Sequence, residues 1–316
     1  MTQCSKYSLN GVYRCENFAQ HVEGRDFPRF PIGSASGLNG WYIKFRVSVY
    51  NYNEWMYPFI SCPNHPKVQV RAYFNILKKD GSSPFEKESK CLYLESNEGC
   101  QDKYVDIEDL LDEENGYLDN GALTVEYGVQ VESVEDVNGI WRFNFFDLFF
   151  NWQNQDNMFD FIIRLENSLF GHKQIIKLHS KKISDSNKDW VRVPKSITVE
   201  ELDMCLQITH GVRLQITVKE LKKTIEIASR FAFSNTVRYC EQQLIKMDEQ
   251  TKLKLTRNVK LAVKFKLERY LNHSIKKIKS PERLMSVLKK LNIEKMSSAT
   301  MKTLLSKYLE LIDFLE

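Results

Sequence analysis

The stretch Glu201 to Ile245, ELDMCLQITHGVRLQITVKELKKTIEIASRFAFSNTVRYCEQQLI, decides the fold of the second half of the chain. Apolar residues recur in it at intervals of three and four through three short segments, which is the spacing of amphipathic helices. Gly211 stands where the first helix is expected to end. Thr217 is placed to cap the second helix, and Ser234 or Asn235 begins the third. The sequence therefore predicts three helices that pack on one another or on a shared sheet.

Length and composition indicate a globular protein with more than one domain. The chain has 316 residues, too many for one ordinary core, and 42% of them are hydrophobic and 27% charged, the usual mixture of soluble proteins. The N-terminus lacks the apolar run of a secretory signal, and the longest apolar-rich stretch, Trp141 to Trp152, is interrupted by polar residues. We expect a cytoplasmic or nuclear protein without a membrane partner. Its seven irregularly spaced cysteines are expected to be reduced thiols.

The two halves of the chain differ in charge. Residues 1–147 contain 14 basic and 22 acidic residues, whereas residues 148–316 contain 31 basic and 19 acidic residues. The halves therefore carry net charges of −8 and +12. An acidic half beside a basic half supports a division into domains that bind different partners or attract each other.

The first half has the patterns of β-strands. Apolar and polar residues alternate, or β-branched and aromatic residues gather, at Trp41 to Val49, Lys67 to Leu77, Lys90 to Leu94 and Gly121 to Val131. A hairpin turn is predicted at Lys79-Asp80-Gly81, and a short helix at Asp106 to Glu114. Several short strands separated by turns favour a β-sandwich over a parallel α/β sheet.

Two blocks of this half resemble the MATH (meprin and TRAF homology) domain. They are VRAYFNILKKDG (Val70 to Gly81) and DLLDEENGYLDNGALTVEYGVQV (Asp109 to Val131), and Asn39 to Ile43 is similar to an early strand of that domain. The resemblance implies an all-β sandwich in residues 1–147. MATH domains of ubiquitin-ligase adaptors hold extended substrate peptides in a shallow groove lined by aromatic residues.

By position in that resemblance, Tyr52, Phe74 and Tyr93 fall where the groove aromatics lie. Aromatic residues that alternate along strands more often pack in a core or across strands, and Phe74 is the strongest candidate for the core. Where the adaptors place a tryptophan and a further aromatic residue, this chain has the polar run Glu95 to Asp102. If the groove is used, its ligands therefore differ from those of the family.

The first half is followed by a connector and then by a segment in which strands are predicted. The connector, Phe143 to Trp152, carries many aromatic residues and is expected to pack between domains. A strand is predicted at Phe159 to Leu165, a turn near Asn167-Ser168, and then a short strand into His172 followed by a helix. The strand with Asp160 and a block formed by His172, Lys173, Ile176, His179 and Ser180 resemble the opening of the BTB (POZ) domain. Glu201 to Ile245 resembles the second half of the same domain.

MATH followed by BTB is a known domain order. The resemblance implies a MATH-like sandwich in residues 1–147, an α+β BTB/POZ domain in residues 148–246 and a C-terminal helical extension in residues 247–316. BTB domains dimerise, and in adaptors they bind a cullin scaffold. The residues that the resemblance assigns to the dimer interface or BTB core are Phe159, Asp160, Ile162, His172 and Lys173.

One departure from the BTB pattern bears on cullin binding. Between Ser180 and Val199 the chain has only KKISDSNKDWVRVPKSIT, where the family fits the rest of a helix, a further helix and a strand. The usual aromatic residue after the His-Ser pair is replaced by Lys181 and Lys182. This region forms much of the cullin-facing surface in the family, so a dimeric scaffold without a cullin is the alternative.

The C-terminal segment, Met247 to Glu316, is helical and basic, with twice as many Lys and Arg residues as Asp and Glu residues. Ser280-Pro281 starts a helix, with serine as the cap and proline at the first position. Lysine-rich helix faces are usually solvated surface, and the segment has no motif that is known to read bases in a nucleic-acid groove. A nucleic-acid-associated BTB protein is therefore a third, less favoured hypothesis.

The sequence offers little for catalysis. His172 and His179 are seven residues apart, and no paired-cysteine, zinc-protease or nucleophile-elbow motif is present. Cys205 and Cys240 are expected to be core thiols. We therefore predict a noncatalytic adaptor with no catalytic residue, metal or cofactor. It binds itself, a cullin-type scaffold and protein substrates with short extended motifs.

Overall fold

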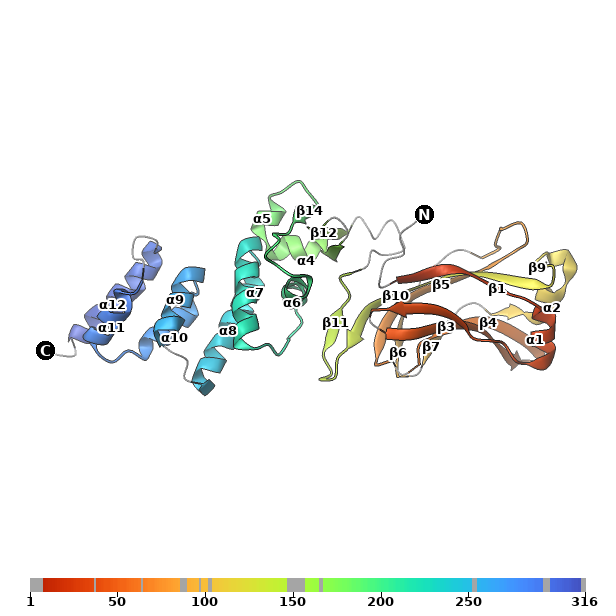
Figure 1. Ribbon diagram of the computed structural model, residues 1–316, viewed down its shortest axis with the longest axis horizontal. Helices are drawn as coiled ribbons and strands as arrows, with labels where there is room; N and C mark the ends of the chain where they lie inside the picture. The colour runs from red at the N-terminus through yellow and green to blue at the C-terminus, as the bar shows by residue number, and fades with distance from the viewer. Residues whose placement is uncertain are drawn as a thin grey trace. The chain divides into compact units, whose positions relative to one another are not determined.

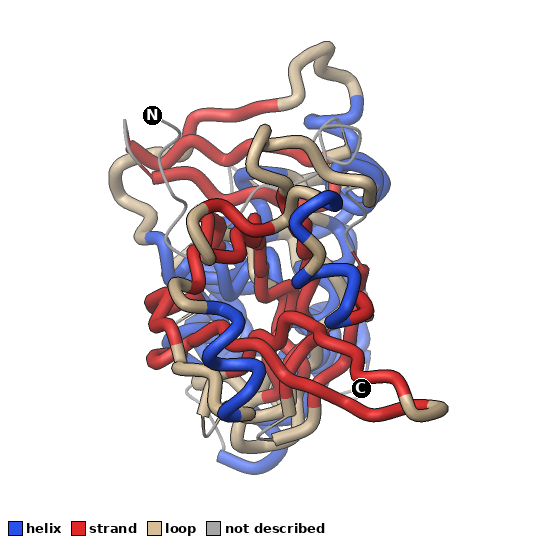
Figure 2. The backbone as a smooth tube through the Cα atoms, turned by 90° about the vertical axis from the view of Figure 1, so that its right-hand side faces the viewer, coloured by secondary structure: helices blue, strands red, loops and turns tan. Residues whose placement is uncertain are grey.

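The computed structural model describes residues 8–36, 38–63, 65–85, 90–96, 98–101, 104–146, 157–164, 167–251, 255–291 and 296–313. It divides into two compact units, one of residues 1–160 with 168–170 and the other of residues 161–167 with 171–316. Antiparallel sheets make up the first unit and helices predominate in the second (Figure 1), which confirms the predicted order of a β-rich part and a helical part. Figure 2 shows the same backbone with strands and helices distinguished by colour.

Two antiparallel sheets form the β-rich unit. In the first sheet the strands lie in the order β1 (Ser8–Cys15), β10 (Ala122–Glu135), β5 (Val68–Leu77) and β6 (Lys90–Leu94), and β9 (Leu118–Asp119) and β11 (Trp141–Phe143) also pair with β10. In the second sheet the order is β2 (Phe30–Ala35), β3 (Leu38–Tyr50), β4 (Asn53–Ser61) and β7 (Gly99–Gln101), and β8 (Val105–Asp106) pairs with β4.

The two sheets share one apolar core, so the unit is a sandwich. Along β3, Trp41, Ile43 and Phe45 are buried, and the residues between them face outward. Phe74 of β5 in the other sheet belongs to the same core. The period-two alternation of the sequence therefore gives each strand one core face and one outer face.

Short turns and helices connect the strands. The β3–β4 turn is formed by Asn51 and Tyr52 with φ values of 50° and 68°, the left-handed conformation that a two-residue hairpin requires. The predicted helix near Asp106 is α2 (Ile107–Leu111) followed by a short 3-10 turn. A helix that was not predicted, α1 (Phe18–Gly24), follows β1. A turn lies at the predicted Lys79-Asp80-Gly81, where the Gly81 backbone N–H donates to the Lys78 carbonyl oxygen at 2.9 Å. The antiparallel partner strand β6 starts only at Lys90, so the connection between β5 and β6 is longer than this turn.

A three-stranded sheet follows the sandwich strands in the chain. Its order is β13 (Asn167–His172), β12 (Met158–Arg164) and β14 (Trp190–Arg192). Helices α4 (Lys173–His179) and α5 (Lys181–Ser184) follow β13. A turn was predicted near Asn167-Ser168; both residues already belong to β13, and the residues between β12 and β13 lie outside the described residues. Leu165 and residues 147–152 of the predicted connector lie outside the described residues.

The stretch 201–245 forms the predicted helices, which are α6 (Val199–Thr209), α7 (Val218–Phe231) and α8 (Ser234–Thr251). Thr198 and Thr217 each form a capping box, in which the threonine side chain accepts from the N3 backbone and the N3 glutamate accepts from the cap backbone. Gly211 follows α6 with a φ of 93°, a conformation that suits glycine. The local start signals thus fix the beginnings of α6 and α7, and Gly211 follows the end of α6.

The described residues after α8 contain α9 (Leu255–Phe265), α10 (Glu268–Lys276), α11 (Pro281–Leu288) and α12 (Ser298–Asp313). The Ser280 side chain accepts from the Arg283 backbone, as the sequence predicts for a serine cap before proline. Among the described residues, no helix combines the length and apolar character needed to cross a membrane.

Candidate functional site

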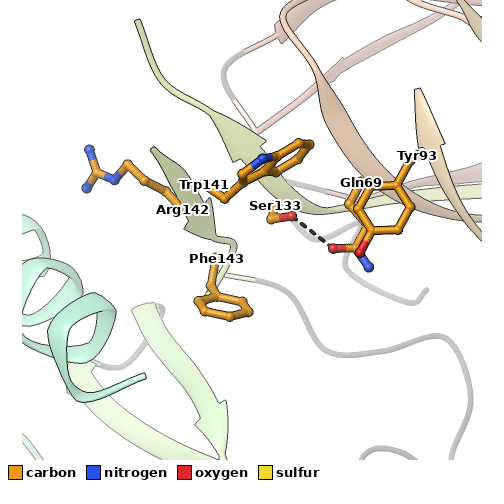
Figure 3. A pocket seen from close by; sticks show the side chains of 6 residues that line it. All are labelled: Gln69, Tyr93, Ser133, Trp141, Arg142 and Phe143. Carbon is orange, nitrogen blue, oxygen red and sulfur yellow. Dashed lines mark hydrogen bonds between the residues drawn. The ribbon is translucent and has the colours of Figure 1, made fainter. Parts of the chain in front are cut away.

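A shallow pocket of about 330 Å³ lies on the outer face of the first sheet. It is lined by Gln69, Tyr93, Ser133, Trp141, Arg142 and Phe143 (Figure 3). The rings of Tyr93 and Trp141 meet edge to face with centroids 6.0 Å apart. In Figure 3 the Arg142 side chain points away from these two rings. The walls of the pocket are therefore aromatic, and Gln69 and Ser133 supply its polar groups.

Strand register explains why these residues meet. Phe143 of β11 is opposite Ser133 of β10, Ser133 is also opposite Gln69 of β5, and Gln69 is opposite Tyr93 of β6. Residues directly opposite one another in a sheet share a face, so these four residues form one row across four strands. Trp141 lies two residues before Phe143 and therefore faces the same way.

A β-bulge in β10 makes the row possible. The register between β10 and β5 shifts between Val131 and Ser133, so Glu132 is an extra residue on β10. Val131 is buried in the core, and Ser133 nevertheless bonds to Gln69 on the outer face. In a regular strand without the bulge, Ser133 would face inward, because it lies two residues after the buried Val131.

A network of polar side chains beside the pocket is electrically neutral. The Ser133 hydroxyl donates to Gln69 Oε1 at 3.1 Å, and Gln69 Nε2 donates to Cys91 Sγ at 3.0 Å. Arg71 Nε and Glu132 Oε1 form a largely buried ion pair at 2.6 Å. Burial, and to a lesser degree the adjacent Glu132, raises the pKa of the Cys91 thiol. This face of the sandwich therefore offers aromatic surface and hydrogen bonds, with no reactive thiolate.

The structure separates the three predicted groove residues. Tyr93 is 71% exposed and lines the pocket. Phe74 is 4% exposed and lies in the core, which confirms the prediction that it is a core residue. Tyr52 is fully exposed in the β3–β4 turn of the other sheet. Trp141, the main aromatic partner of Tyr93, was not singled out from the sequence, although it begins the longest apolar-rich stretch.

The outer face of the second sheet is basic. Arg29, Lys44 and Arg46 have no ion pair with any described residue. Instead, Arg29 lies over the ring of Tyr42 at 4.7 Å and Arg46 over the ring of Phe59 at 3.4 Å. Burial, followed by repulsion from the two arginines, lowers the pKa of Lys44. This face thus offers cations held over aromatic rings, whereas the pocket face offers exposed aromatic rings beside hydrogen-bonding groups.

The residues predicted for dimerisation lie in and around the three-stranded sheet. Phe159 is 1% exposed, and Asp160 and Ile162 alternate with it on β12 and are half-buried. Burial raises the pKa of Asp160. Lys173, at the start of α4, forms an ion pair with Asp189 at 2.5 Å. A role of these residues in self-association stays a prediction.

His172 and His210 face each other with ring centroids 5.3 Å apart. The His210 ring has one nitrogen 2.8 Å from the carbonyl oxygen of Leu206, and its Nε2 accepts from the His172 backbone N–H at 3.2 Å. These partners require the neutral ring with its proton on Nδ1. Burial lowers the pKa of His210 to about 4, so the ring is neutral near pH 7.

The cysteines of the helical unit are buried thiols. Burial raises the pKa of Cys205 above its usual range and that of Cys240 to about 12, which keeps both protonated at neutral pH. Among the described residues, no group of three or more His, Cys, Asp or Glu side chains is arranged to hold a metal ion. The pocket of the sandwich is therefore the candidate functional site.

No protein-family model matches this chain, and no curated protein matches it significantly in sequence.

Proposed function

We propose that the protein is a noncatalytic adaptor that holds a short extended segment of another protein on its sandwich. The pocket around Tyr93 and Trp141 carries this proposal, because aromatic walls beside a few polar groups are typical of sites that bind peptides. The resemblance of the first half to MATH domains supports the same role, and the two-sheet architecture agrees with that resemblance.

The proposal is tested with the full chain against an array of short peptides, followed by titration of the best binder. Tyr93→Ala and Trp141→Ala should each weaken binding at least tenfold, since truncating a central aromatic anchor of an interface costs on the order of 2 kcal/mol. Tyr52→Asn is the matched control, because it removes an exposed tyrosine from the other sheet and keeps a residue that tolerates a positive φ. Equal losses in all three variants, or binding unchanged in the two pocket variants, would contradict the proposal.

The adaptor further acts as a dimer that brings its bound substrate to a cullin-RING ubiquitin ligase, where two weak sites gain avidity. This part rests on the resemblance of Phe159 to Lys246 to the BTB domain. The monomer mass is 37.2 kDa, so light scattering at micromolar concentration should give about twice that value. A mass equal to that of the monomer would refute dimerisation, and a dimer that fails to retain purified cullin would refute the ligase role.

A second candidate is a dimeric scaffold that binds no cullin. One observation favours it, because the chain between α5 and α6 contains only the three-residue strand β14. This stretch exposes Trp190 beside Lys188 instead of presenting a further helix. The cullin pull-down distinguishes the two candidates.

A further inference from the structure

The helices α9 to α11 carry an unusual excess of positive charge. Residues 255–291 contain eleven Lys or Arg residues and two Glu residues, which gives a net charge of +9 with histidine neutral. All eleven side chains belong to exposed residues. The excess is local, since these 37 residues hold most of the net charge of the second half.

One of these cations forms an ion pair within the part of the chain that the structure describes, and another, Lys264, lies over the ring of Phe265 at 4.7 Å. Lys277 forms an ion pair with the buried Asp248 at 2.6 Å, and the other ten form no ion pair with any described residue. Ion pairs with neighbours are the usual way in which a helix surface balances its charge. Ten unbalanced cations repel one another, so their arrangement costs stability that an anionic partner would restore.

The cations follow helical stripes on the solvent side. On α9, Arg257, Lys260 and Lys264 are spaced by three and four residues, which places them on one face, while Val259 and Ala262 are buried on another. On α10, Arg269 and Lys276 are seven residues apart and share a face in the same way. The two helices pack against each other, so their stripes belong to one helical hairpin.

The kind of anion follows from what these helices lack. Among the described residues, α9 and α10 expose no large hydrophobic side chain, and α11 exposes one, Met285, which is 39% exposed and not aromatic. Protein interfaces depend on buried aromatic or apolar anchors, and interfacial helices insert an apolar face into a membrane. Single-stranded nucleic acids need exposed aromatic rings on which bases stack. A surface that offers cations without such groups instead suits the phosphate backbone of a nucleic-acid duplex.

We propose that the helical hairpin of α9 and α10, extended by α11, binds the backbone of a nucleic-acid duplex without regard to base sequence. This activity is separate from the peptide pocket. The sequence alone did not favour nucleic-acid binding by the basic C-terminal segment, whereas the exposed cations of α9 to α11 support it. Lys and Arg contacts to phosphates release counterions, so binding weakens steeply as salt rises.

The test measures binding of the full chain to fluorescent duplexes of two unrelated sequences by anisotropy. We expect equal affinities for both, and a loss of roughly a hundredfold or more between about 50 and about 200 mM salt. The variant R257E/K260E/K264E/R269E should weaken binding at low salt by at least about tenfold and reduce the salt dependence by about one power of salt concentration for each lost contact.

A matched control carries the same change in charge elsewhere on the helical unit. The variant K181E/K219E/K222E/R230E reverses four cations that form no ion pair with a described residue. Circular dichroism establishes that both variants are folded. If the control loses as much affinity as the test variant, net charge alone drives binding and the proposal is wrong. It is also wrong if the chain binds vesicles of anionic lipid or polyglutamate but does not bind the duplex.

Discussion

The sandwich and the helical unit treat ionisable groups in opposite ways. The described carboxylates that are buried, Asp203, Glu241 and Asp248, all belong to the helical unit, whereas the core of the sandwich is built from apolar side chains. The ionised pairs of the sandwich, such as Arg71 with Glu132, lie on its outer face. The stability of the sandwich therefore depends mainly on apolar packing. The stability of the helical unit depends in addition on buried charges that have specific partners, so it should also depend on pH.

Asp248 shows what this dependence means. Its carboxylate is 1% exposed and lies in α8, where it accepts from Asn258 Nδ2 of α9 at 2.9 Å and from Lys277 Nζ beyond α10 at 2.6 Å. The nearby Glu241 accepts from the Tyr270 backbone at 2.9 Å and so caps the first turn of α10. Two carboxylates of one helix thus hold the next two helices in place.

Asp248→Ala tests this difference most severely. The variant loses two hydrogen bonds to a buried carboxylate, each worth about 1.5 to 3 kcal/mol, and leaves the buried Asn258 amide without its acceptor, whereas the exposed Lys277 is hydrated. We therefore expect a loss of roughly 3 to 5 kcal/mol in the free energy of unfolding. Glu310→Ala is the control, because its ion pair with Lys307 is solvent-exposed on the glutamate side and contributes less than about 0.5 kcal/mol. Denaturant unfolding followed by circular dichroism measures both, and similar losses would mean that Asp248 is not a hub.

Phe74→Ala is the corresponding test in the sandwich. Truncating this buried ring should cost about 3 to 5 kcal/mol, because it leaves a cavity between two sheets. Tyr93→Ala, on the outer face of the same sheet, should cost less than about 1 kcal/mol of stability while weakening peptide binding at least tenfold. If Tyr93→Ala destabilised the protein as much as Phe74→Ala, the division into a core face and a binding face would fail.

His210 should make the helical unit sensitive to acid. Its pKa is about 4 when folded and near the ordinary 6.5 when unfolded, so the unfolded state binds the extra proton first as pH falls. The stabilising contribution is complete above about pH 6.5 and is lost progressively toward pH 4, with roughly 2 kcal/mol lost at pH 5. His210→Gln keeps a donor and an acceptor but does not titrate, so its unfolding free energy should change less between pH 7 and pH 5. An identical pH dependence in both proteins would contradict the assignment.

The smallest expected effect concerns the helix caps. Thr217→Ala removes the hydroxyl that accepts from the Glu220 backbone at 3.3 Å, and it should cost about 1 kcal/mol. Thr303→Ala lies inside α12, where alanine is the better helix former, and should cost nothing. Thermal unfolding of the two variants gives the comparison, and a cap variant as stable as the control would show that packing alone positions α7.

Local signals predicted the helices well and the pocket poorly. Thr217, Gly211 and Ser280 act within a few residues of their own position, so their effect is visible in the sequence. The pocket instead depends on the bulge at Glu132, which changes the face of Ser133, and on pairings between strands far apart in the sequence. No local periodicity contains that information, and this is why Trp141 was missed while Tyr93 was found through a resemblance.

Strand β1 was missed for the same reason. Its sequence, SLNGVYRC, is short and contains Gly11, so it lacks a clear alternation. Its partner strand among the described residues is β10, with Ser8 opposite Gln130 and Cys15 opposite Leu123. Asp248 was likewise not singled out, because the sequence does not show that Asn258 and Lys277 lie beside it.

The late position of β10 in the chain also sets the order of events during synthesis. The β3–β4 hairpin joins neighbours in sequence and can form as soon as both strands have been made. The core side chains of β1, such as Tyr13, have no sheet partner until β10 follows them. The nascent chain therefore presents an unpaired first strand throughout the translation of most of the sandwich, the stage at which a chaperone has the most surface to protect.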